Sequence, residues 1–165
     1  MFFKKKIAIE DYCSGTLKAL FSPERELVYE RLRDACADPA LSAADRKLYF
    51  DHVRAVIIEL VNIAIIKNCG FDVSSDARVF IAGYLEERGL SHIDSLSPDS
   101  LTSIYNSAFA TPGQDGVGSI SAAFSEQVTG SLMRQETLQR FYVEFYAILK
   151  SLFDELKSIK LVTTR

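Results

Sequence analysis

The stretch Val53-Arg54-Ala55-Val56-Ile57-Ile58-Glu59-Leu60-Val61-Asn62-Ile63-Ala64-Ile65-Ile66 is the most apolar part of the 165-residue chain. A capping-box pattern, Ser42-Ala43-Ala44-Asp45, precedes it, and Gly70 can close a helix behind it. The β-branched residues also suit a buried strand, but the span from cap to glycine is far longer than an ordinary strand. Because the run is apolar on nearly every side, we predict a central helix that ends near Asn68. Four of its side chains should be almost fully buried: Ile57, Leu60, Val61 and Ala64.

This central run is too short to cross a bilayer, which needs about 20 apolar residues, and Glu59 and Asn62 interrupt it. The N-terminal Phe2-Phe3-Lys4-Lys5-Lys6 lacks the order of a signal peptide, in which positive charges precede a longer apolar stretch. The three cysteines show no Cys-x-x-Cys spacing, which favours reduced thiols. We therefore expect a cytoplasmic protein without a transmembrane segment.

Apolar residues recur at helical spacing through most of the remaining chain. Start and stop signals such as Ser22-Pro23-Glu24 and Asp38-Pro39 divide it into segments. The helices predicted in this way cover about 9–20, 23–36, 43–68, 74–88, 98–109, 120–128 and 133–160. We find no convincing strand and no internal repeat. The expected fold is all-α: a single domain over residues 1–165, built as a bundle of six or seven helices around the central apolar helix.

The composition is that of an ordinary globular protein, with 48% hydrophobic and 25% charged residues, which excludes an intrinsically disordered chain. The formal net charge is −3 and the pI is near 5.4. Proteins that bind nucleic acids usually carry a basic stripe or a high pI, and neither is evident. The composition therefore argues against nucleic-acid binding.

Three polar residues inside the central run are the weak candidates for a functional site: Glu59, His52 and Asn62. A carboxyl group among apolar neighbours has a raised pKa, which is the environment of a general acid. The more common outcome is a hydrogen bond to a Tyr, Arg or Asn across the core. Asp45, His52 and Glu59 share one helix face, but ligands two turns apart lie about 10 Å apart, too far for one metal ion. We predict that Glu59 is at least partly buried and hydrogen-bonded to another helix.

Motifs for catalysis or phosphate binding are incomplete in this sequence. The run Gly113–Ser119 lacks the lysine of a phosphate-binding loop, and Asp115 would repel an anion. Ser91, His92 and Asp94 lie too close in sequence to form a triad, and no cofactor or metal motif is present. We expect a non-catalytic protein rather than an enzyme. The Gly- and Pro-rich segment Pro112–Gly118 is predicted to be a mobile surface connection that binds no phosphate.

These observations favour a non-catalytic cytoplasmic protein that acts through interaction or assembly. A homodimer is plausible, because the helix over 133–160 carries a wide apolar stripe that a domain of this size need not cover. The alternative is a helical protein that binds a small apolar ligand or a lipid between its helices. Weak peripheral contact with an anionic membrane is a further possibility, carried by five N-terminal residues: Phe2, Phe3, Lys4, Lys5 and Lys6.

Overall fold

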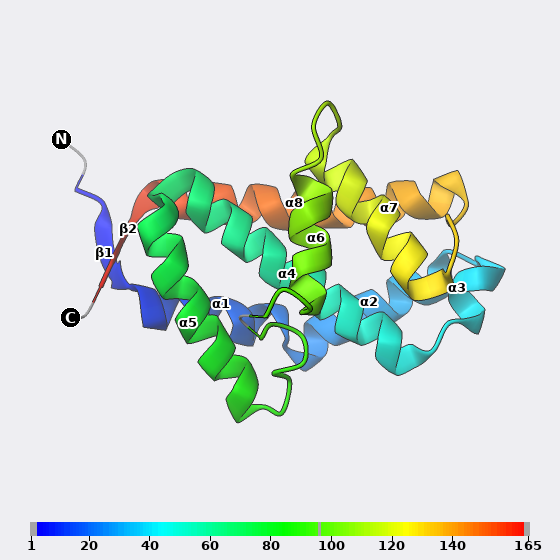
Figure 1. Ribbon diagram of the computed structural model, residues 1–165, viewed down its shortest axis with the longest axis horizontal. Helices are drawn as coiled ribbons and strands as arrows, with labels where there is room; N and C mark the ends of the chain where they lie inside the picture. The colour runs from blue at the N-terminus through cyan, green and yellow to red at the C-terminus, as the bar shows by residue number, and fades with distance from the viewer. Residues whose placement is uncertain (1–2, 96, 164–165) are drawn as a thin grey trace.

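The computed structural model describes residues 3–95 and 97–163, and this part of the chain folds into eight helices and two short strands (Figure 1). The elements are β1 (Lys5–Ala8), α1 (Ile9–Leu20), α2 (Pro23–Ala35), α3 (Pro39–Ala43), α4 (Arg46–Cys69), α5 (Phe71–Glu87), α6 (Leu101–Phe109), α7 (Gly116–Thr129), α8 (Gln135–Ser158) and β2 (Ile159–Val162). The all-α class is confirmed. The expected count of six or seven helices is too low, because the one-turn helix α3 is too short to show an apolar period.

Helix α4 is the centre of the fold, as the sequence predicts. It packs against α8 along its length and also contacts α5, α6 and α7 (Figure 1). The side chains of Ile57, Leu60, Val61 and Ala64 are each 0% exposed. These four predictions are confirmed, and the buried apolar residues of the chain form one continuous cluster around this helix.

Side-chain caps fix where several helices begin. The Asp45 carboxylate accepts a hydrogen bond from the backbone N–H of Leu48 at 2.8 Å, so α4 begins at Arg46. Gly70, at φ 91°, ends α4 and also caps α5. Helix α5 therefore begins at Phe71, earlier than the predicted start, because a glycine at positive φ turns the chain at once into the next helix.

The prediction for Pro112–Gly118 is wrong for its second half, because Gly116 and Gly118 lie in the first turn of α7. The Asp115 carboxylate caps this helix: it accepts hydrogen bonds from the N–H groups of Val117 (3.1 Å) and Gly118 (3.5 Å). Position 116 needs glycine, since a Cβ there would lie 2.5 Å from the ring of Phe109. The acidic residue occupies the amides that a phosphate would use.

The expectation that no segment forms a strand is also wrong. Strands β1 and β2 pair in parallel, with Lys5 opposite Ile159 and Ala8 opposite Val162. They bring the two ends of the described chain together at one end of the molecule (Figure 1). Four-residue strands separated by the whole helical bundle leave no local signal that distinguishes them from helix ends.

The apolar stripe of α8 is covered within the chain. Its large side chains, including Phe141, Phe145 and Leu152, are buried, and those left exposed are Val143 and Tyr146. The sequence argument for a homodimer therefore loses its basis, although self-association itself stays a prediction. Among the described residues, no helix is long and apolar enough to cross a membrane.

Candidate functional site

Glu59 lies at the centre of a polar cluster between α4, α5 and α6. Its side chain is 0% exposed and accepts hydrogen bonds from two other helices: from Asn106 Nδ2 of α6 at 2.8 Å and from Arg78 Nη2 of α5 at 3.3 Å. The prediction of a buried, hydrogen-bonded Glu59 is confirmed. Burial raises the pKa of the Glu59 carboxyl, and the bond from Asn106 and the charge of Arg78 only partly offset this effect.

A second buried carboxyl, Asp94, lies beside this cluster in the connection between α5 and α6. Asp94 Oδ1 accepts a hydrogen bond from Thr102 at 2.8 Å, while Oδ2 has no partner within the described part of the chain. Burial raises the pKa of Asp94 too, and the nearby charge of Arg78 opposes that rise. The positive charge of Arg78 thus lowers the pKa of both buried carboxyl groups, while the negative charge of Asp94 raises the pKa of Glu59.

The other two candidates on α4 are buried but have different environments. Asn62 lies next to Glu59 and lowers its pKa, although no residue in the described ranges meets hydrogen-bond geometry with the Asn62 amide. His52 instead contacts α6, where its Nδ1 is hydrogen-bonded to the Tyr105 hydroxyl at 2.8 Å. Burial lowers the pKa of His52. The structure therefore brings Glu59 and Asn62 together and places His52 in a separate contact with Tyr105.

A pocket of about 460 Å³ opens to solvent above the Glu59 cluster. Arg78 and Asn106, the two donors to Glu59, are part of its wall. On α5 the lining residues Phe71, Ser74, Ser75 and Arg78 follow helical spacing, so one face of the helix presents them all. Serines from the α5–α6 connection and from α6 complete the wall. This open, serine-rich pocket differs from the closed apolar chamber that an apolar ligand requires.

Asp38 is a buried carboxylate, although its position before Pro39 in the sequence predicts only the end of a helix. It is 2% exposed and caps α3 through the N–H groups of Ala40 (3.0 Å) and Leu41 (3.4 Å). Its other oxygen accepts from the Arg134 N–H at 3.2 Å and from the Thr137 hydroxyl at 3.1 Å. Burial favours the neutral form, but these bonds outweigh it and lower the pKa of Asp38. Asp38 therefore ties α3 to the start of α8.

The other reactive side chains of the described residues include three thiols and the ion-paired Asp51. All three cysteines are free, and burial raises the pKa of the Cys13 thiol to about 12. Asp51 is ion-paired with Lys47 and Arg54 and hydrogen-bonded to His92; burial alone would raise its pKa, but the hydrogen bonds from Lys47 and His92 outweigh burial and lower it. Within residues 3–95 and 97–163, no three His, Cys, Asp or Glu side chains gather as a metal-ligand set.

The terminal sheet, β1 with β2, presents two different faces. The inner face carries Ile159 and Leu161, which are buried against the bundle. On the outer face Lys6 stands directly opposite Lys160, and both are exposed. No carboxylate of the described residues pairs with either lysine within 4 Å. Like charges that face each other across strands are destabilising.

Comparison of the chain with family models, with curated proteins and with solved structures finds no match. Two regions of the described chain have the features of a binding surface: the Glu59 pocket and the terminal sheet.

Proposed function

We propose that this is a non-catalytic interaction protein and that its terminal sheet binds an extended, acidic segment of a partner protein. The observation that carries the proposal is the sheet itself: two parallel strands whose outer edges have no further strand in the described chain. Parallel strands are normally found in larger sheets that are covered on both faces. Each open edge presents backbone N–H and C=O groups that can pair with an added strand.

The charge of the sheet selects the partner. Lys5 and Lys6 of β1 and Lys160 of β2 are exposed, and Lys4 precedes them. A strand with alternating Asp or Glu side chains would place carboxylates beside the Lys6–Lys160 pair and relieve its repulsion. A second copy of the same sheet would add more positive charge, so this surface disfavours a homodimer.

Two other functions receive less support from the structure. The alternative of a bound apolar ligand or lipid needs a closed apolar chamber, whereas the pocket above Glu59 is open to solvent and has Arg78, Asn106 and several serines in its wall. Membrane contact through the N-terminal residues shares the exposed Phe3 and Lys4–Lys6, while Phe2 lies outside the described residues. Because Lys5 and Lys6 are held in a strand with unpaired edge groups, the geometry suits a peptide better than a lipid surface.

Titration with short peptides tests the proposed function. A peptide of alternating glutamate and valine should bind with saturable heat in calorimetry and should slow amide hydrogen exchange in β1 or β2. The matching lysine–valine peptide should not bind. The double variant Lys6→Glu, Lys160→Glu should weaken binding at least about tenfold, because two attractive contacts become repulsive.

Lys18→Glu is the matched control, since Lys18 is an exposed lysine on α1 that lies outside the sheet. This variant should bind the acidic peptide like the unmodified protein. Equal binding by the double variant would refute the sheet as the contact surface. Binding to phosphatidylserine vesicles without any binding of the acidic peptide would assign the lysines to a membrane instead. A dimer whose formation slows amide hydrogen exchange in β1 or β2 would assign the sheet edge to a second copy.

A further inference from the structure

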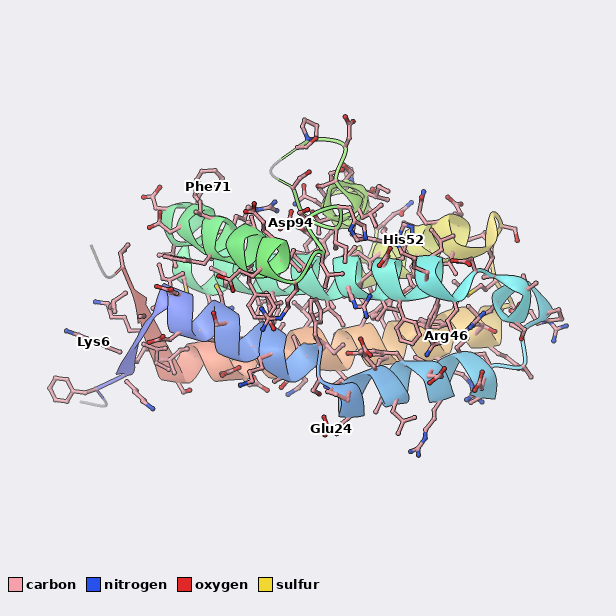
Figure 2. The ribbon with its side chains drawn as sticks, turned by 90° about the horizontal axis from the view of Figure 1, so that it is seen from below. Lys6, Glu24, Arg46, His52, Phe71 and Asp94 are labelled. Carbon is pink, nitrogen blue, oxygen red and sulfur yellow. The ribbon has the colours of Figure 1, made fainter. Side chains whose placement is uncertain are left out.

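The pocket above Glu59 is independent of the terminal sheet and has the construction of a binding site. It lies between α5 and α6, and its wall contains one guanidinium, one amide and several hydroxyl groups. Its volume of about 460 Å³ is within the range of small-molecule sites, about 300–1,000 Å³. Phe71, at the start of α5, is 76% exposed and lies on the surface beside this wall (Figure 2).

The buried Glu59 carboxylate holds the two strongest donors of the wall in place. Asn106 and Arg78 come from different helices, and each donates to a different oxygen of Glu59. A guanidinium has five N–H donors, and the bond to Glu59 uses one of them. Fixing Arg78 from below reduces the entropy that it would lose on binding a ligand, which is the advantage of a preorganised site.

The chemistry of the wall points to an oxyanion. Arginine recognises carboxylate and phosphate oxygens through paired N–H bonds, and serine hydroxyls add further donors. Ser74 and Ser75 lie about one helical turn before Arg78 on α5. Apolar groups, from Ile66, Phe71 and Pro98, also line the pocket and can cover the body of a small molecule.

We propose that this pocket binds a small molecule that carries a carboxylate or phosphate group on an apolar body, with Arg78 as the residue that holds the oxyanion. Arg78 faces two carboxyl groups, Glu59 of α4 and Asp94 of the connection, and Asn106 of α6 is neutral. An added anion raises the cost of keeping both carboxyl groups ionised. Binding therefore takes up a proton, and affinity rises as the pH falls.

Calorimetric titration with benzoate and with inorganic phosphate tests the proposal, with benzyl alcohol as the neutral analogue of benzoate. Benzoate should bind saturably and benzyl alcohol should not. Arg78→Gln should weaken benzoate binding at least about tenfold, the usual scale of one lost charge-assisted contact. Arg31→Gln, on the exposed side of α2, is the matched control and should bind normally.

Two further variants separate binding from folding. Phe71→Ala changes a surface residue, so it should leave stability unchanged, weaken benzoate about threefold and leave phosphate unaffected. Glu59→Gln keeps an amide oxygen that can accept a hydrogen bond from Arg78 but removes the negative charge beside the bound anion, so it should tighten benzoate binding at pH 7, a result that a purely structural Glu59 would not give. Between about pH 7 and pH 5.5, where benzoate stays ionised, the affinity of the unmodified protein should rise.

The proposal is overturned if neither benzoate nor phosphate gives saturable heat up to millimolar concentrations. Equal affinity of Arg78→Gln and the unmodified protein, or equal binding of benzyl alcohol and benzoate, would also overturn it. Since this pocket does not include β1 or β2, loss of peptide binding at the sheet leaves these outcomes unaffected.

Discussion

Asp38 and Glu59 are both buried carboxyl groups, exposed by 2% and 0%, yet their pKa values move in opposite directions. Asp38 accepts four hydrogen bonds, three of them from backbone N–H groups at the start of α3 and α8. Glu59 accepts hydrogen bonds from Asn106 and Arg78, two side chains that also line a pocket. The kind of donor therefore separates a structural carboxylate from one that can respond to a ligand.

Backbone donors are fixed by the helices themselves, so they stabilise the ionised form at little further entropic cost. Side-chain donors lose conformational entropy when they are ordered. At Glu59 the cost of burying the charge exceeds the stabilisation from these donors, so the pKa is raised. The difference between backbone and side-chain donors should therefore appear in the stability of variants at each carboxyl group.

Asp38→Ala should lower the free energy of unfolding by about 3 kcal/mol, because it leaves buried N–H groups of two helix starts without an acceptor. Asp38→Asn should cost about half as much, since one oxygen remains to accept. Urea unfolding at pH 7 measures both values. The control Asp34→Ala removes an exposed acid of α2 and should change stability by less than about 0.5 kcal/mol. A loss below about 1 kcal/mol for Asp38→Ala would contradict the structural role.

Glu59→Gln should change stability by only about 1 kcal/mol at pH 7. The variant loses the ion pair with Arg78, but it no longer has to bury a charge, and the two effects largely cancel. Urea unfolding is again the measurement. If Glu59→Gln cost as much as Asp38→Ala, side-chain donors would stabilise a buried carboxylate as well as backbone donors do, and the comparison would fail.

Much of the Glu59 environment could be predicted from the sequence, because its apolar neighbours on α4 are local in the chain. The identity of its partners could not, since Arg78 and Asn106 come from helices whose orientation depends on the connection between them. His52 shares a helix face with Glu59 in the sequence but is hydrogen-bonded to Tyr105, whereas Glu59 accepts from the next residue of α6, Asn106.

The features that the sequence analysis missed depend on contacts between distant segments. Asp38 looks like a helix terminator before Pro39, and nothing local shows that Arg134 and Thr137 lie beside it. The strands β1 and β2 are four residues each and pair across almost the whole chain. The cap at Ser22 and the apolar period of α4 were predictable because both depend on a few neighbouring residues. The capping box predicted at Ser42 was wrong, because the chain forms the short helix α3 there and Asp45 itself caps α4.

Asp94 extends the comparison to a third buried carboxyl, which has one side-chain donor, Thr102, and one oxygen without a partner in the described chain. Asp94→Asn keeps an acceptor for Thr102 and removes the buried charge. Stability at pH 7 should therefore stay the same or rise by less than about 1 kcal/mol. Urea unfolding should show that the loss in free energy of unfolding decreases from Asp38→Asn through Glu59→Gln to Asp94→Asn. A larger loss for Asp94→Asn than for Asp38→Asn would contradict this order.

The smallest effect is the pH dependence of these differences. The folded state lowers the pKa of Asp38, so its contribution is present above the ordinary value of 3.8 and is lost as the pH falls through its lower folded value. The folded state raises the pKa of Glu59, so stability falls as the pH rises from the ordinary value of 4.5 through its higher folded value. His52 and Asp94 also titrate, but they are present in every protein compared.

Urea unfolding between pH 3 and pH 8 should therefore show that the stability advantage of the unmodified protein over Asp38→Asn becomes smaller in acid. As the pH rises, the free energy of unfolding of the unmodified protein should instead fall relative to that of Glu59→Gln. Parallel profiles for all three proteins would mean that neither carboxyl has a shifted pKa, and that the donors around Asp38 and Glu59 do not distinguish them.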